Sequence, residues 1–136
     1  MKILFVCRGN VARSQMAEAY YNFLTKTKDA SSAGVLDFTP LKYGRPVKEV
    51  IQVMKEDGID ISQQNVKFIT EEMVKESDRI FVMCEKEECP EFLLNSNKIT
   101  FWDIDDPYNT DIENHRKIRD EVKKQVRLLI ENINTK

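Results

Sequence analysis

The chain has 136 residues, a length that fits one domain with a substantial hydrophobic core. Hydrophobic residues make up 41% of it and charged residues 32%, the balance of a folded domain and not of a disordered one. The 21 basic and 23 acidic residues leave a formal net charge of -2, so we expect no general attraction to nucleic acid or to a membrane surface.

The sequence contains no segment that predicts membrane insertion or export. The longest apolar runs are about five residues, far short of the roughly 20 that span a bilayer. Only Lys2 lies ahead of the first apolar run, so a signal peptide is not expected. Three cysteines without an export signal favour reduced thiols in the cytoplasm over a disulfide scaffold.

The apolar pattern predicts strands that alternate with helices along the whole chain. Strands are expected at residues 3–7, 30–33, 80–84 and 99–102, and helices at about 12–26, from 47 until Gly58, at 70–77 with Thr70 as N-cap, and at about 111–133. This alternation predicts an α/β fold with a doubly wound parallel sheet. Ligands of such sheets bind beyond the carboxyl ends of the strands, so the residues that follow each strand are the candidates for chemistry.

The segment from Cys7 to Ser14 (CRGNVARS) joins the first strand to the first helix. Its backbone N–H groups lead into a helix N-terminus, which favours a bound anion and also favours the thiolate form of Cys7. Arg13 offers a planar fork of donors that suits a tetrahedral oxyanion, and Ser14 can donate a hydrogen bond to the thiolate. A cysteine, an arginine and a serine at this spacing after a strand predict a phosphate-type anion site.

This segment resembles the active-site loop of the low-molecular-weight protein tyrosine phosphatase family, which includes the related thioredoxin-coupled arsenate reductases. The resemblance covers almost the entire chain and rests on residues 6–14, 32–34, 58–62 and 105–108. It implies a single domain over residues 1–136, with a four-stranded parallel sheet in the order 2-1-3-4 and helices on both faces.

The resemblance also implies roles for individual residues. Cys7 would be the nucleophile that forms a phosphocysteine, Arg13 the transition-state clamp and Asp106 the general acid. Asp106 precedes Pro107, which stiffens its loop, and a departing phenolate or alkoxide needs a proton. The loop residues that bind the phosphate would be Arg8, Gly9, Asn10, Val11, Ala12, Arg13 and Ser14, with Asn10 holding the unusual backbone conformation.

Two aromatic residues favour a phosphatase that acts on phosphotyrosine-type esters. Phe38 and Tyr108 stand where the phosphatases carry aromatic side chains, and two rings flanking the loop would sandwich the ring of a phosphotyrosine. The expected partner is therefore a phosphorylated protein or a small aryl phosphate. No cofactor and no metal are expected.

Two further cysteines keep arsenate reduction open as the alternative. Cys84 and Cys89 resemble the thiols with which the reductases pass a disulfide from the nucleophile toward thioredoxin. Residues 15–18 (QMAE) also resemble the reductases. Against the relay, two fewer residues separate Cys84 from Cys89 than in those enzymes, and neighbouring glutamates would raise the pKa of Cys89.

Other features are assigned no catalytic role. Some reductases brace the loop with potassium, for which the matching positions are Asn10, Glu18, Ser32 and Asp60. His115 and the acidic runs, including residues 85–88, are expected to face solvent. A phosphocarrier domain is disfavoured because a carrier needs no general acid, and a non-catalytic phosphate-binding module because nucleophile, clamp and acid are all present.

Overall fold

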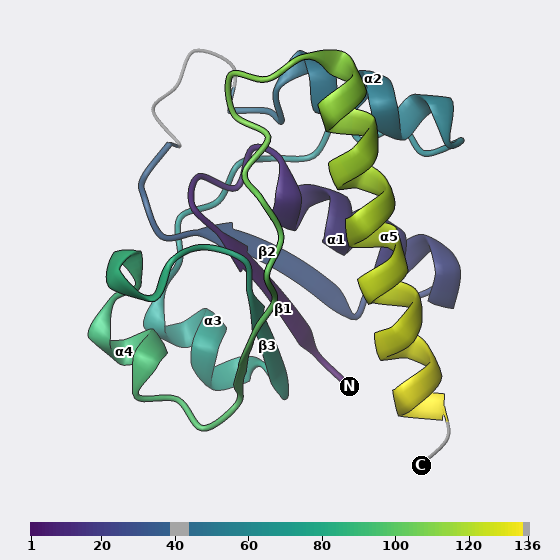
Figure 1. The fold of residues 1–136 in the computed structure, drawn as a ribbon. Helices are drawn as coiled ribbons and strands as arrows, with labels where there is room; N and C mark the ends of the chain where they lie inside the picture. The colour runs from purple at the N-terminus through teal and green to yellow at the C-terminus, as the bar shows by residue number, and fades with distance from the viewer. Residues whose placement is uncertain (39–43, 135–136) are drawn as a thin grey trace.

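The computed structural model describes residues 1–38 and 44–134, and it contains the predicted parallel sheet (Figure 1). The central strand β1 (Ile3–Cys7) pairs with β2 (Ala30–Gly34) on one side and with β3 (Arg79–Val82) on the other. The edge strand β4 (Ile99–Phe101) pairs with β3. The resulting order, β2-β1-β3-β4, confirms the predicted α/β class and topology.

Helices cover both faces of this sheet (Figure 1). One face carries the three longer helices, α1 (Arg13–Thr25), α2 (Lys48–Glu56) and α5 (Ile112–Asn134). The other face carries two short helices, α3 (Glu71–Glu76) and α4 (Glu91–Leu94). None of the helices in the described part of the chain is long and apolar enough to cross a membrane.

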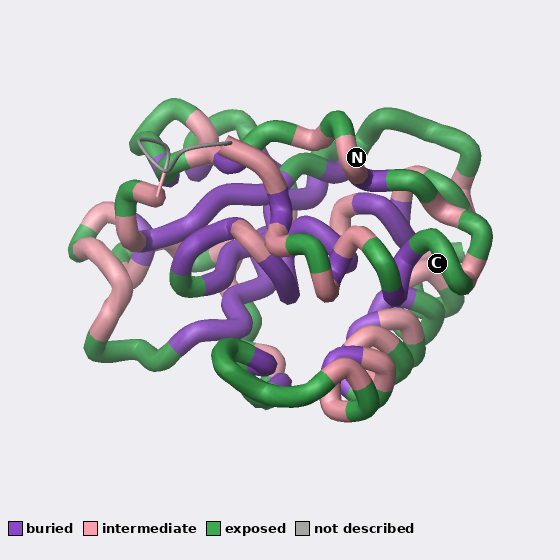
Figure 2. Tube along the Cα trace, turned by 90° about the horizontal axis from the view of Figure 1, so that it is seen from above, coloured by how far each residue is buried: buried purple, intermediate pink, exposed green. Residues whose placement is uncertain are grey.

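The alternating side chains of β1 divide the core into two layers. Ile3, Phe5 and Cys7 pack into the layer of α1, α2 and α5, whereas Leu4 and Val6 pack into the layer of α3 and α4. All five are buried, and Figure 2 shows buried segments running through the middle of the molecule. Cys7 therefore ends its strand on the side of the sheet where α1 begins.

The structure differs from the sequence prediction mainly between β3 and β4. The strand predicted to reach residue 84 ends at Val82, and it is followed by the 3-10 turn η1 (Lys86–Glu88) and by α4, neither of which was predicted. Both are too short for a helical periodicity to be visible. The predicted N-cap is confirmed, because the Thr70 side chain accepts a hydrogen bond from the Met73 amide over 3.2 Å.

Ion pairs fix the long helix α5 against α2. Arg116 lies 2.8 Å from the Glu56 carboxylate, and Lys123 lies 2.9 Å from that of Asp57. Asp57 also accepts a hydrogen bond of 2.7 Å from the buried Tyr20 hydroxyl of α1. Burial and this carboxylate raise the pKa of Tyr20, so the hydroxyl stays protonated and keeps donating. The start of α5 is thereby held in one place relative to α1 and α2.

The end of β2 and the loop after β1 approach each other closely. A Cβ atom added to Gly34 would lie 2.7 Å from the carbonyl carbon of Gly9 and 2.9 Å from the amide nitrogen of Asn10. We therefore expect Gly34→Ala to displace this loop and to lower the free energy of unfolding by about 1–3 kcal/mol. Urea unfolding measures the change, with Ser31→Ala, an exposed position of the same strand, as the control. Equal stability of Gly34→Ala and wild type would contradict this packing.

Candidate functional site

The loop between β1 and α1 lines one end of a cavity of about 580 Å³. Cys7 is 3% exposed, and its sulfur lies 2.9 Å from the Ser14 hydroxyl, which can donate to a thiolate. The other predicted phosphate-binding residues lie around this sulfur in the same loop, and Arg8, Gly9, Val11, Ala12 and Arg13 line the cavity with Cys7. The loop ends in the N-terminus of α1, where the helix dipole favours a bound anion.

Asn10 holds the loop in shape. Its backbone is left-handed, with φ 59°, and its side chain is completely buried. The amide nitrogen donates to the hydroxyl oxygens of Ser14 (2.7 Å) and Ser32 (2.9 Å). The amide oxygen accepts from the Lys67 backbone (2.9 Å) and the Gln15 side chain (3.0 Å). One side chain thus ties the loop to α1, to β2 and to the segment after α2.

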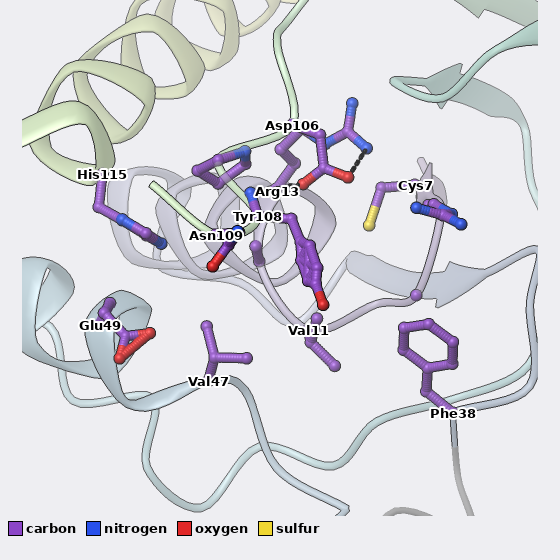
Figure 3. A pocket seen from close by; sticks show the side chains of 14 residues that line it. Cys7, Val11, Arg13, Phe38, Val47, Glu49, Asp106, Tyr108, Asn109 and His115 are labelled. Carbon is purple, nitrogen blue, oxygen red and sulfur yellow. Dashed lines mark hydrogen bonds and ion pairs between the residues drawn. The ribbon is translucent and has the colours of Figure 1, made fainter. Parts of the chain in front are cut away.

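Arg13 is buried beside the thiol, and its guanidinium is oriented by backbone carbonyls. Its Nη1 donates to the carbonyl oxygen of Met83 and, over 2.9 Å, to that of Ile104. Its Nη2 lies 3.6 Å from the Asp106 carboxylate, as the dashed line in Figure 3 indicates. The carbonyl bonds fix the plane of the guanidinium, so the edge formed by Nε and Nη2 is the one that can present two donors to an oxyanion.

The two predicted aromatic residues both line the cavity. The Phe38 ring covers Gly9 so closely that a Cβ atom at Gly9 would overlap it. Tyr108 is 71% exposed at the mouth, and its backbone amide donates to Asp106 over 3.0 Å. Figure 3 shows both aromatic side chains directed into the cavity in front of Cys7.

Arg8 and the acidic run after Cys84 are linked. The Arg8 side chain is half-exposed, and its Nε lies 3.1 Å from Glu88 of η1. Glu85 and Glu88 also form a reciprocal capping box at the start of this turn. The prediction that residues 85–88 simply face solvent is therefore wrong for Glu88, which partly neutralises the charge of Arg8.

The prediction that His115 faces solvent is also wrong. His115 is 3% exposed and lines the cavity from the first turn of α5, together with Glu49 and Asn109, which were not predicted as site residues. A sequence signal was present, because His115 lies three residues before Ile118 and seven before Val122, on the buried stripe of α5. Glu49 gave no such signal, since a glutamate in the first turn of a helix is common.

Cys84 and Cys89 lie together, but on the other side of the sheet from Cys7. Their sulfur atoms are 3.8 Å apart, and Cys84 packs into the core layer of α3 and α4. Burial raises the pKa of both thiols. Cys89, Cys7 and Glu88 raise the pKa of Cys84 further, whereas the hydrogen bond with Cys84 offsets part of the rise for Cys89. Both are therefore protonated near neutral pH, and the rate of any disulfide formation between them should rise with pH.

The residues matched to a potassium site do not fit one. The Ser32 hydroxyl donates to Glu18 over 2.7 Å, and the Lys67 ammonium lies 3.5 Å from the same carboxylate, where it already supplies a positive charge. The Asp60 carboxylate instead accepts from the Ser62 amide over 2.9 Å. Across residues 1–38 and 44–134, no group of three or more His, Cys, Asp or Glu side chains could hold a metal ion.

A thiol at the end of a central parallel strand, a loop leading into a helix N-terminus and a buried arginine define a cysteine-dependent enzyme that acts on tetrahedral oxyanions. The model of the low molecular weight phosphotyrosine protein phosphatase family matches residues 2–136. The chain belongs to this family.

Arsenate reductases and phosphatases both resemble the chain over nearly its full length. An arsenate reductase of Halalkalibacterium halodurans is 33% identical over 95% of this chain and 94% of its own. The low molecular weight protein tyrosine phosphatase of T. tengcongensis is 32% identical, with a TM-score of 0.81 over 97% of this chain and 99% of its own. The YwlE arginine phosphatase of Geobacillus stearothermophilus is 27% identical, with a TM-score of 0.83 over 98% of this chain and 93% of its own.

Two substitutions of Asn10 distinguish the contribution of its side-chain hydrogen bonds from that of backbone strain. Asn10→Gly tolerates the left-handed backbone but removes every side-chain bond, whereas Asn10→Ala removes the bonds and adds strain. We expect both variants to lose stability, by about 1–3 kcal/mol for each buried group left unpaired. Both should also bind inorganic phosphate much more weakly, as measured by calorimetry. Wild-type phosphate affinity in Asn10→Gly would show that the side chain is dispensable.

Proposed function

We propose that the protein is a phosphatase that hydrolyses phosphate monoesters of aromatic alcohols, of the phosphotyrosine type, through a phosphocysteine on Cys7. The observation that carries this proposal is the apolar, aromatic-flanked cavity in front of the thiol. At about 580 Å³ it is far larger than a tetrahedral oxyanion requires. Phe38 and Tyr108 flank the position that an aryl ring would take, with the phosphate at the loop.

The proposed first step transfers the phosphoryl group to sulfur. The Cys7 thiolate attacks phosphorus, the S–P bond forms as the ester P–O bond breaks, and the proton of Asp106 passes to the leaving phenolate oxygen. The loop amides and the Nε–Nη2 edge of Arg13 bind the equatorial oxygens, on which charge accumulates in the transition state. The 3.6 Å approach of Nη2 to Asp106 supports an arrangement in which clamp and acid reach the same phosphate.

The proposed second step returns the enzyme to its starting state. The Asp106 carboxylate takes a proton from a water molecule, whose oxygen attacks phosphorus, and the S–P bond breaks to release inorganic phosphate and the thiolate. The Ser14 hydroxyl, 2.9 Å from the sulfur, stabilises that thiolate as it leaves. Accordingly, Cys7→Ser should have no measurable activity.

The role of Asp106 predicts a dependence on the leaving group. Asp106→Asn should slow the hydrolysis of phenyl phosphate by roughly 10²–10⁴-fold, the usual contribution of a positioned acid. The loss should be much smaller for an ester whose leaving phenol is already acidic, such as 4-nitrophenyl phosphate. Steady-state kcat values across a series of phenols measure this. An equal decrease in kcat for all of these esters would show that Asp106 is not the general acid.

Arsenate reduction is the second candidate, favoured by the 3.8 Å contact between the sulfur atoms of Cys84 and Cys89. The arsenate reductase of Halalkalibacterium halodurans, at 33% identity, supports it as well. In this reaction the Cys7 thiolate would bond to arsenic as an As–O bond breaks and that oxygen leaves as water. Cys84 would then attack the Cys7 sulfur, and arsenite would leave with the electron pair of the S–As bond. Cys89 would then attack Cys84, which frees Cys7, and thioredoxin would reduce the resulting Cys84–Cys89 disulfide.

The position of Cys84 weighs against this relay. Val6 pairs with Val82, so Cys7 is level with Met83, and Cys84 lies one residue beyond it with its side chain in the opposite core layer. Cys84 lines a second cavity, bounded by Arg8, Arg13 and Asp106, to which Cys7 does not contribute. Its raised pKa also disfavours attack near neutral pH.

One pair of assays separates the two activities. Wild type and Cys84→Ser should hydrolyse an aryl phosphate at nearly the same rate, because Cys84 lies outside the cavity of Cys7. With thioredoxin, thioredoxin reductase and NADPH, neither protein should turn over arsenate. Arsenate turnover in wild type that disappears in Cys84→Ser would establish the reductase instead, with hydrolysis as a side activity.

A further inference from the structure

The cavity in front of Cys7 has a second end, which the proposed reaction does not use. Figure 3 shows Cys7, Arg13 and Asp106 together at one end, and Glu49 and His115 at the other, with Val47 near them. Glu49 comes from the first turn of α2 and His115 from the first turn of α5.

The His115 ring is directed into this end of the cavity. Its Nδ1 lies 2.8 Å from the backbone carbonyl oxygen of Asp111, which can only accept, so Nδ1 carries a proton. In the neutral ring Nε2 is then the acceptor, and Figure 3 shows the ring directed from α5 into the cavity. The ring is 3% exposed and its α5 backbone is fixed by the ion pair of Arg116 with Glu56, so this acceptor is held in position.

Glu49 carries a carboxylate at the same end of the cavity. Glu49, His115 and Asn109 all line the cavity, and Figure 3 shows Glu49 and His115 at the end away from Cys7. The start of α2 is tied to the phosphate loop, because the Val47 amide donates to the Val11 carbonyl over 3.1 Å. The backbone that carries Glu49 is therefore held beside the phosphate loop.

The cavity is thus polarised along its length. At one end Arg8, Arg13 and the loop amides favour an anion, with Asp106 as the carboxylate of that end. Glu49 places a negative charge at the other end, and the wall between them carries Val11 and Val47. A phosphate ester that is neutral beyond its ring would leave the carboxylate partly desolvated without a partner. A substrate with a cation at its far end would match both charges.

We propose that Glu49 and His115 form a subsite for an ammonium or guanidinium group on the same substrate whose phosphate binds at Cys7. The carboxylate supplies the opposite charge and Nε2 of His115 accepts a hydrogen bond from the cationic nitrogen. The subsite rests on the proposed phosphatase function, since it selects among the esters that the cavity admits. Its two residues determine specificity and take no part in the bond-breaking steps.

Binding of non-hydrolysable phosphonates tests the subsite without requiring turnover. The probes are 4-(aminomethyl)benzylphosphonate and 4-methylbenzylphosphonate, which differ in one ammonium group. By calorimetry, wild type should bind the ammonium probe more tightly by roughly five- to tenfold, the size of a partly buried charge-assisted contact. Glu49→Gln should abolish the preference while leaving the affinity for the methyl probe unchanged. Glu72→Gln, which removes the same charge from exposed α3 on the other face of the sheet, should keep the preference.

Substitution of Glu49 could also destabilise α2, so a charge reversal at Glu49 and a pair of phosphotyrosine peptides provide further tests of the subsite. Glu49→Lys should reverse the preference, so that the ammonium probe binds more weakly than the methyl probe. Phosphotyrosine peptides with lysine or norleucine beside the phosphotyrosine show whether a basic side chain can supply the cation. Equal affinities for both members of each pair in wild type, or a preference that survives in Glu49→Gln, would overturn the subsite. Binding of neither phosphonate would overturn the aryl phosphatase proposal and the subsite with it.

Discussion

The buried amide of Asn10 is the constraint on which the site depends. A loop that turns its N–H groups toward an anion needs a left-handed residue, and an L-residue with φ 59° requires compensation. Four hydrogen bonds from the Asn10 side chain provide it, and they reach α1, β2 and the Lys67 backbone at once. The loop is thus shaped before an anion arrives, which is the condition under which its dipoles lower a transition state most effectively.

The register of the sheet decides which thiol can act in the cavity. Because side chains alternate along a strand, Cys7 faces the layer of α1 while Cys84, one residue beyond the level of Cys7, faces the layer of α3. The two chemistries known among the relatives therefore differ in a geometric requirement. Hydrolysis uses groups that already line one cavity, whereas disulfide relay requires the segment from Met83 to Cys89 to bring Cys84 across to Cys7.

The sequence predicted the parts of the molecule that follow from short-range patterns. Strands β1 and β2, amphipathic α5 and the loop from Cys7 to Ser14 all carry their signals in neighbouring residues, and they lie close to where they were expected, whereas β3 ends two residues before its predicted end. The turn η1 and helix α4 were missed because three or four residues are too few for a helical period. Glu49 was missed because its place in the cavity depends on how α2 packs beside α5, which no local pattern contains. His115 was misjudged from its charged neighbours, although its spacing on the apolar stripe of α5 indicated burial.

Rapid chemical quenching shows whether the phosphoryl group is transferred to Cys7 during turnover. Wild-type protein is mixed with excess aryl phosphate, quenched in acid within the first turnovers, and digested for peptide mass spectrometry. We expect one added PO₃ unit on the peptide that contains Cys7, formed together with a burst of phenol. Steady hydrolysis with no added phosphoryl group on that peptide, or with one on another residue, would contradict it.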